Sequence, residues 1–303
     1  MSRRRASGIV GLLVVLGLVG YLLISPPSAL TAVLTGDRPS AVAGQEVPAI
    51  EGAPAVRIAV AGDTGTGTAA EEATAQRMAA EGRQRPYDGL LLLGDLIYDV
   101  GDATLVDRVV TEPFSPVLDG GAKLLPVLGN HDYGSGEPQQ ILTALGADAP
   151  WYAAQVGSVR ILVLDSNRVG DPQQTQWLRE TLAAPQAAGT WTVAAMHHPA
   201  YSAGHHGSDL SVREAWGPLF ADAGVPLVLA GHDHDYQRST PQDGVIYVVS
   251  GAGASTRRVG HEDFTAVSSA TLHYLDLLAY DDHLVGRAID QQGKLLDSFT
   301  ITR

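Results

Sequence analysis

Five apolar segments of the sequence end in a side chain that can bind a metal ion. The segments span 56–62, 89–94, 124–129, 191–196 and 225–231, and they are followed by Asp63, Asp95, Asn130 with His131, His197, and His232 with His234. Ligands of open α/β sheets collect beyond the carboxyl ends of strands. A single Asp or His after a strand is commonly a turn former or a cap. Five such ends in one chain predict a shared metal site.

The spacing of these residues supports that interpretation. In an extended segment, residues two apart face the same side, so His232 and His234 can both point into a site while Asp233 points away. Asp95 and Tyr98, three apart, can share one face of a helical turn or a tight bend. Glycines precede the candidate ligands and permit a sharp turn and a close approach; they are Gly62, Gly94, Gly129 and Gly231.

The stretch 56–82 also allows a different interpretation. Gly65, Gly67 and Ala70 fit the G-x-G-x-x-A spacing of a dinucleotide-binding loop, and Asp95 could hold the ribose. That interpretation explains none of the other strand ends. We therefore interpret Asp63 as a metal ligand and the glycines after it as its turn.

Five short motifs occur in a fixed order between residues 55 and 260, namely GDTG, GDLIY, GNHD, VAAMH and GHDH. Together they resemble the signature motifs of the calcineurin-like metallophosphoesterases. Tyr98, in GDLIY, resembles the tyrosine of the purple acid phosphatase branch. One motif alone would be weak, whereas five in order are specific.

The resemblance implies two metal ions that share Asp95 as a bridging ligand. Fe(III) would be held by Asp63, Asp95, Tyr98 and His234, and a divalent ion (Fe, Zn or Mn) by Asp95, Asn130, His197 and His232. The donor types agree with this division. Phenolate and carboxylates are hard anionic donors that suit a trivalent ion, whereas neutral imidazole and amide groups suit a divalent one.

The same resemblance implies roles for further histidines in proton transfer. His131 would give a proton to the leaving oxygen, and Asp132 could orient it. Either His205 or His206 should reach the phosphate, and His206 is favoured because the dipeptide HG at 206–207 fits the family pattern better. His198 then packs against the site or supports it.

Other polar residues receive structural interpretations. Asp165 follows the apolar segment 159–164 and is expected to be a cap, because the family does not use this position. The segment 250–255, SGAGAS, is expected to be a turn near the site, not a phosphate cradle. Histidines 261, 273 and 283 lie outside the motifs and are expected to be surface or internally hydrogen-bonded residues.

The elements that must position these residues alternate between short apolar segments and amphipathic helices. Asp171 and Pro172 predict the start of a helix that Pro185 ends, and Ser211 with Glu214 has the spacing of a capping box. After residue 245 the pattern predicts antiparallel strands. The expected fold is an α/β four-layer α-β-β-α sandwich, with two central mixed β-sheets flanked by helices.

Composition limits the kinds of partner. The net charge of −13 repels polyanions, so a nucleic-acid scaffold is a poor expectation, although bound metals can reverse the field locally for a small anionic substrate. The chain has no cysteine, which excludes disulfides and thiolate zinc sites.

The N-terminus predicts export. MSRRR precedes an uncharged apolar run whose residues 8–24 are near the short limit for a spanning helix. We expect residues 1–25 to be a signal-anchor or a signal peptide, 26–54 to be a Pro/Ala/Gly-rich linker, and 55–303 to be the metallophosphoesterase domain. An uncleaved anchor with an extracytoplasmic catalytic domain is favoured over secretion after cleavage.

The sequence thus predicts an exported metal-dependent phosphomonoesterase of the acid-phosphatase type. In such an enzyme a metal-bound hydroxide attacks phosphorus in a small phosphate ester. Two alternatives remain open. One is a phosphodiesterase or nucleotidase with the same metals, and the other is a non-catalytic surface binding protein on the same fold.

Overall fold

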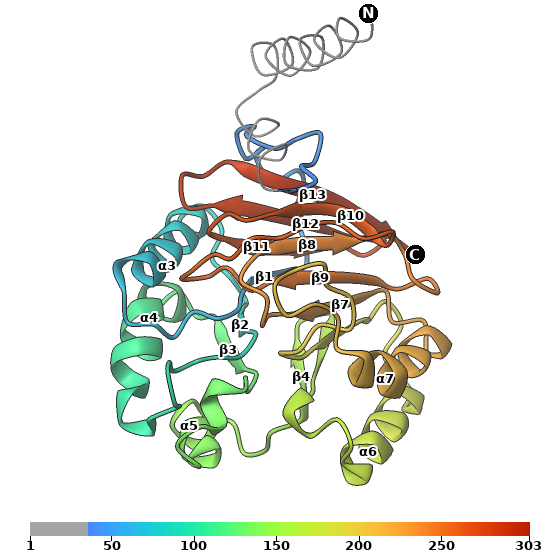
Figure 1. Ribbon diagram of the computed structural model, residues 1–303. Coiled ribbons are helices and arrows are strands. Elements are labelled where there is room, and N and C mark those ends of the chain that lie inside the picture. The colour runs from blue at the N-terminus through green and yellow to red at the C-terminus, as the bar shows by residue number, and fades with distance from the viewer. Residues whose placement is uncertain (1–35) are drawn as a thin grey trace, which may run out of the picture.

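Two mixed β-sheets occupy the centre of the protein in the computed structural model, which describes residues 36–303 (Figure 1). The six-stranded sheet has the order β13-β12-β11-β1-β2-β3. In it β1, β2 and β3 are parallel to one another, and the other neighbouring strands are antiparallel. Its strands are β1 (Val56–Ala61), β2 (Gly89–Leu92), β3 (Lys123–Pro126), β11 (His273–Ala279), β12 (His283–Asp290) and β13 (Leu295–Thr302).

The seven-stranded sheet has the order β10-β8-β9-β7-β6-β5-β4, and β5, β6, β7 and β9 are parallel. Its strands are β4 (Tyr152–Val156), β5 (Val159–Val163), β6 (Trp191–Ala195), β7 (Leu227–Ala230), β8 (Tyr236–Ser239), β9 (Ile246–Ser250) and β10 (Thr265–Ser269). Each of the six apolar segments named in the sequence analysis overlaps a strand of one of the two sheets, and the antiparallel strands predicted after residue 245 are present.

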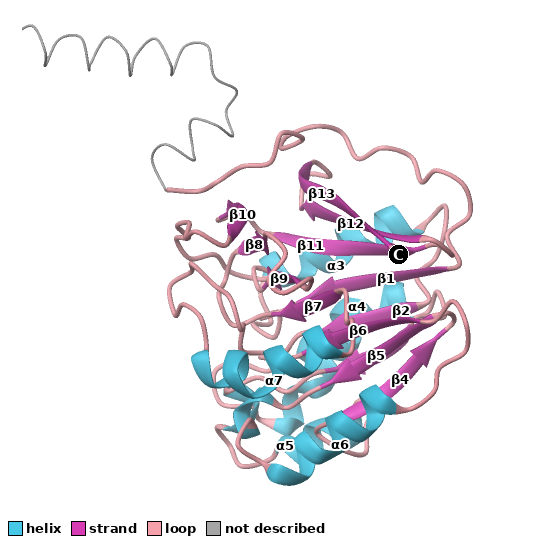
Figure 2. Cartoon of the chain, turned by 90° about the vertical axis from the view of Figure 1, so that its right-hand side faces the viewer, coloured by secondary structure: helices cyan, strands magenta, loops and turns pink. Residues whose placement is uncertain are grey.

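The central strands are apolar on both faces because each sheet is covered on both sides. Ile58 of β1 and Ile161 of β5 belong to one core between the sheets. Ala59, on the other face of β1, packs toward α3 (Ala69–Gly82), α4 (Glu112–Leu118) and α5 (Pro138–Ala144). Leu162, on the other face of β5, packs toward α6 (Pro172–Ala183) and α7 (Leu210–Asp222). Figure 2 shows the second set of helices in front of the seven-stranded sheet.

The predicted N-terminal cap is correct for α6 and wrong for α7. Asp171 caps α6 by accepting from the backbone N–H groups of Gln173 and Gln174, as predicted. The predicted capping box of α7 is wrong, because Asp209 is the cap and accepts from Ser211 N at 2.9 Å. A carboxylate placed two residues earlier competes better for the free N–H groups of the first turn. Short helical turns span Ala103–Leu105, Asp107–Thr111, His131–Tyr133 and Ser166–Arg168.

Residues 36–54, within the expected linker, lie against the sheets. Arg38 N donates to Ser268 O at 3.0 Å, and Gly44 N donates to Leu295 O at 2.7 Å. Val42 and Val47 pack against the core beneath α3. The apolar segment at 8–24 lies outside the described residues, and within residues 36–303 no helix is long and apolar enough to cross a membrane.

Candidate metal centre

The candidate ligands all lie just beyond the carboxyl ends of parallel strands. Asp63 follows β1 and Asp95 follows β2, both in the six-stranded sheet. His197 follows β6 and His232 follows β7, both in the seven-stranded sheet. The two sheets therefore face each other with their ligand-bearing ends at one rim, where the turns meet.

The first group of donors surrounds the hydroxyl of Tyr98. This hydroxyl donates to Asp63 Oδ1 at 3.2 Å and to Asp95 Oδ2 at 3.0 Å, and it lies 3.1 Å from His234 Nε2. His234 Nε2 is in turn 3.4 Å from Asp63 Oδ1. Four side chains from distant parts of the chain thus direct their polar atoms to one point.

The second group of donors surrounds Nε2 of His197. This atom lies 3.1 Å from Asn130 Oδ1, 3.4 Å from Asp95 Oδ1 and 3.2 Å from His232 Nδ1. Asp95 therefore belongs to both groups, with Oδ2 in the first and Oδ1 in the second. The structure brings together all seven residues that the sequence predicted as ligands.

The backbone at this rim adopts conformations that are rare in other places. Asp63, Asp95 and His232 have positive φ angles of 57°, 51° and 71°. Non-glycine residues in the left-handed region cost free energy and are concentrated at functional sites. Gly129 is also required, because a Cβ there would lie 2.1 Å from Asp95 N and Oδ1.

Hydrogen bonds from outside the two groups fix the imidazole rings. His197 Nδ1 lies 2.9 Å from Leu93 O, which leaves Nε2 facing the other donors. His234 Nδ1 pairs with Ser255 Oγ at 2.6 Å, so that its Nε2 also faces inward. Such bonds select the tautomer and the orientation of a metal-binding histidine.

The pKa shifts of the donor side chains are those of a buried site that could hold metal cations. Burial raises the pKa of Asp63 to about 8 and lowers the pKa of His232 to about 2. Burial also raises the pKa of Tyr98, which the carboxylates of Asp63 and Asp95 raise further. Within residues 36–303 no Lys or Arg forms an ion pair with either carboxylate. Buried oxygen and nitrogen donors without a cationic side chain are what a bound metal ion would satisfy.

Ligand atoms of Asp63, Asp95 and His197 lie within 4.8 Å of one another, and so do those of His197, His198 and His232. His198 lies beside the second donor group, and the sequence analysis gave it the role of packing against the site or supporting it. Its Nδ1 is 2.8 Å from Ser166 Oγ, and burial next to His197 lowers its pKa to about 4.

His131 lies beside the first group. Its ring centre is 4.5 Å from that of Tyr98, its side chain is 36% exposed, and its Nδ1 is 2.5 Å from Asp99 O. Asp132 does not orient it, contrary to the sequence expectation. The buried Asp132 carboxylate accepts from the backbone N–H groups of Gly129 at 2.7 Å and Ile97 at 3.0 Å, and therefore joins two ligand-bearing turns.

His206 lies beside the second group, with its ring centre 4.3 Å from that of His232. Its backbone N donates to Asp233 Oδ1 at 2.7 Å, which attaches the loop at 202–206 to the turn after β7. His205 contacts the ring of His206 at 4.9 Å.

One cationic residue near the centre was missed by the sequence analysis. Arg257 is exposed, its Nη1 lies 3.0 Å from His206 Nε2, and its backbone N donates to His234 O at 2.8 Å. No motif contains it. It follows Ser255, which holds His234, and only the folded loop brings it to the histidines.

The residues that the sequence analysis expected to have structural roles, and not to bind metal or phosphate, have such roles in the structure. Asp165 accepts from Asn167 N at 3.1 Å and caps the turn Ser166–Arg168. The segment 250–255 packs on the first ligand turn, where Gly253 N donates to Gly62 O at 3.1 Å. Histidines 261, 273 and 283 each have a hydrogen-bonding partner away from the centre.

The sequence profile described as calcineurin-like phosphoesterase matches residues 56–236. The human tartrate-resistant acid phosphatase type 5 is 30% identical over 240 residues, which cover 66% of this chain and 73% of that protein. Purple acid phosphatase 3 of Arabidopsis thaliana is 26% identical over 251 residues, covering 72% of this chain and 69% of that protein.

Among solved structures, the fold is similar to the purple acid phosphatase PPD1 from yellow lupin. The TM-score is 0.71 at 20% identity, and the match covers 82% of this chain and 54% of that one. At this identity the likeness shows the fold alone. The family resemblance expected from the five motifs is confirmed: the chain belongs to the calcineurin-like phosphoesterase family, and its sequence relatives are purple acid phosphatases.

Proposed function

We propose that this protein is an exported, dinuclear-metal phosphomonoesterase of the acid-phosphatase type. The observation that carries the proposal is the pair of donor groups that share Asp95, one around the hydroxyl of Tyr98 and the other around Nε2 of His197. The acid phosphatases among its relatives support the same reaction class.

The donor chemistry assigns a metal to each group. Asp63, Asp95, Tyr98 and His234 would hold Fe(III), because three of these ligands are oxygen donors that are anionic when bound. Asp95, Asn130, His197 and His232 would hold Fe(II), Zn or Mn. When bound, the two cations would activate a water molecule and neutralise the charge of the phosphoryl group.

The histidines beside the two donor groups would transfer and position protons. His131 lies against Tyr98 of the first group and His206 against His232 of the second, so a phosphate ester bound between the groups would have an imidazole near each of them. As the bond between phosphorus and the leaving oxygen breaks, a protonated imidazole gives its proton to that oxygen, and the product leaves as a neutral alcohol. Arg257, beside His206, adds positive charge where the ester would enter.

The reaction is tested by comparing hydrolysis of p-nitrophenyl phosphate with that of bis(p-nitrophenyl) phosphate by the purified, metal-analysed protein. We expect the monoester to be hydrolysed with the higher kcat/KM at acid pH. Faster cleavage of the diester would favour a phosphodiesterase. Protein with two metals per chain and no turnover of either compound would favour a binding protein.

The proposed location outside the cytoplasm depends on the apolar segment at residues 8–24. We propose that this segment anchors the catalytic domain to the membrane. Membrane fractionation followed by N-terminal sequencing tests it, because an anchored protein keeps its first residues in the membrane fraction. A soluble exported protein that begins after residue 25 would show cleavage instead.

A further inference from the structure

Five arginines line a surface hollow that lies far from the candidate metal centre. The hollow has a volume of about 610 Å³, and its walls come from the segments 47–52 and 77–85 and from β1 and β12; the arginines are Arg57, Arg77, Arg83, Arg85 and Arg287. Arg57 lies at the start of β1, whereas Asp63 follows its end. Six residues of extended chain place the two about 20 Å apart.

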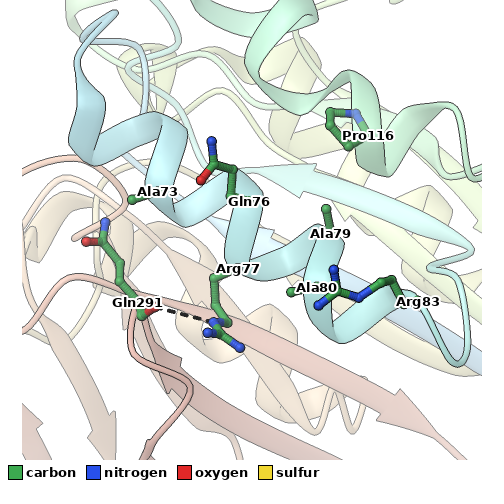
Figure 3. A pocket seen from close by; sticks show the side chains of 8 residues that line it. All are labelled: Ala73, Gln76, Arg77, Ala79, Ala80, Arg83, Pro116 and Gln291. Atoms are coloured by element: carbon green, nitrogen blue, oxygen red, sulfur yellow. Dashed lines mark hydrogen bonds between the residues drawn. The ribbon is translucent and has the colours of Figure 1, made fainter.

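A second hollow of about 690 Å³ adjoins the first along α3, and Arg77 and Arg83 line both. Figure 3 shows that Arg77 projects from the helix toward Gln291, whose carbonyl oxygen accepts from Arg77 Nε at 3.3 Å. Arg83 lies just past the end of the helix. The two guanidinium groups thus stand between the hollows.

The acidic side chains near the first hollow do not balance these arginines. Arg57 and Arg287 are 1% and 3% exposed and share one carboxylate, that of Asp276. Arg77 pairs with Glu81 at 3.1 Å. Arg83 and Arg85 have no acidic partner among residues 36–303. A chain with a net charge of −13 thus concentrates five of its 20 Lys and Arg residues here with an excess of positive charge.

Some of these arginines have an internal role that needs no ligand. Arg57 Nη1 donates to Glu81 O at 3.0 Å and to Arg85 O at 2.6 Å, and therefore satisfies carbonyl groups at the end of α3. A cation there also interacts favourably with the helix dipole. Arg57 is accounted for by these bonds.

Other donors of the hollow are only partly satisfied within the chain. Arg287 Nη1 donates to Pro48 O at 2.8 Å and Arg85 Nη2 donates to Pro54 O, but Arg85 Nε and Arg287 Nε are buried and have no hydrogen-bond partner among the described residues. The exposed guanidinium of Arg83 has no partner within residues 36–303. A buried donor without a partner destabilises the fold. Guanidinium groups in this number match the oxygen geometry of a phosphate, which accepts paired N–H donors.

We propose that this hollow, which we call the arginine hollow, binds a phosphate-class anion. The anion is either free phosphate or the phosphate of an acidic lipid headgroup, which present the same oxygens. The segment 47–52, which forms one wall, belongs to the part of the chain that joins the N-terminal residues to β1. The arginine hollow does not depend on the proposed phosphatase activity.

Hydrogen–deuterium exchange of the full-length chain in detergent tests this proposal, because the readout is local. Exchange is compared in potassium phosphate and in potassium chloride of equal ionic strength, for the wild type and the double variant Arg83→Gln/Arg85→Gln. Arg179→Gln, an exposed arginine of α6, is the matched control. We expect phosphate to slow exchange in 47–52 and 81–87 by at least about threefold once it reaches twice its dissociation constant.

The double variant should lose this protection, whereas Arg179→Gln should keep it. A lipid arm repeats the measurement with the chain in nanodiscs of phosphatidylcholine, with and without phosphatidylglycerol. Protection by phosphate identifies free phosphate as a ligand, and protection only by phosphatidylglycerol identifies the headgroup. Unchanged exchange in both arms, or equal protection in the double variant, would overturn the proposal. Unaltered exchange of β1 and β2 in the double variant verifies its folding.

Discussion

The hydroxyl of Tyr98 donates to Asp95 Oδ2 across 3.0 Å, so the tyrosine of the first donor group meets the carboxylate that both groups share. We expect an Fe(III) ion bound here to give a visible tyrosinate-to-iron charge-transfer band. Tyr98→Phe should abolish the band, because it removes the phenolate oxygen and leaves the other ligands. Visible spectra with metal analysis measure both effects.

Tyr133→Phe is the matched control for that substitution. The hydroxyl of Tyr133 donates to Asp165 Oδ2 at 2.5 Å and takes no part in either donor group. Its removal should leave the band unchanged. A colourless, iron-free wild type that still hydrolyses phosphate esters would rule out the iron assignment and leave a different pair of metals.

The neighbouring histidines 205 and 206 should differ in their effect on turnover. His206 lies against His232 and beside Arg257, whereas the ring of His205 contacts that of His206. Loss of one hydrogen-bond donor to the reacting group typically lowers kcat by about 10²–10³-fold. We expect His206→Ala to lower kcat for p-nitrophenyl phosphate by at least about 100-fold, and His205→Ala by less than about threefold. The reverse order would assign the contact with the phosphate to His205.

Gly65 should not tolerate a side chain. A Cβ at this position would lie 1.9 Å from the carbonyl oxygen of Leu96, so the turns that carry Asp63 and Asp95 would have to separate. We expect Gly65→Ala to lower the free energy of unfolding by about 1–3 kcal/mol, as overpacking does, and to reduce metal content. Chemical denaturation with metal analysis measures both.

Gly170→Ala is the control, since no atom lies within 4 Å of a Cβ there and its φ is not positive. Removing a glycine at such a place should leave stability unchanged or raise it by less than about 1 kcal/mol. Equal losses in the two variants would mean that the contact with Leu96 is not the cause.

The stability of the fold should fall in acid partly through His273. Its ring is buried and hydrogen-bonded to Ser250 Oγ at 3.0 Å, and burial lowers its pKa from 6.5 to about 4. Between these values the unfolded chain binds a proton that the folded chain does not. The free energy of unfolding therefore decreases as pH falls from 6.5 to 4, by about 3 kcal/mol for this shift.

His273→Gln should remove that part of the pH dependence. The difference in unfolding free energy between wild type and variant should shrink by a similar amount between about pH 7.5 and pH 4. His283→Gln, at a partly exposed histidine of β12, should change the curve little. Parallel curves for wild type and His273→Gln would contradict the buried neutral ring.

The donor groups were predictable from the sequence because most of the ligands directly follow an apolar segment. Those ligands are Asp63, Asp95, Asn130, His197 and His232. The carboxyl ends of parallel strands lie at the same edge of a sheet, so residues that follow such strands lie close together in the fold. Asp63, Asp95 and His197 are examples. The strands themselves were visible as continuous apolar runs, which burial on both faces requires.

Other features depend on contacts between distant residues. Asp132 was assigned to its neighbour His131, but its partners include Ile97, 35 positions away. Residues 36–54 read as a tether by composition, although Gly44 pairs with Leu295 through its backbone, which leaves no trace in the side chains. Arg57 and Arg287 become neighbours only when β1, β11 and β12 pair.

The ligands come from both β-sheets, and this affects the stability of the protein. Asp63 follows a strand of the six-stranded sheet and His234 follows a strand of the seven-stranded one, yet Asp63 Oδ1 and His234 Nε2 lie 3.4 Å apart. Metal ions bound by residues of both sheets would link the two sheets at this rim. Part of the free energy that holds the sheets together would then come from metal binding. We therefore expect chelation of the metals to destabilise the whole protein and to lower its melting temperature. The cofactors that perform the chemistry would thus also stabilise the packing of the two sheets.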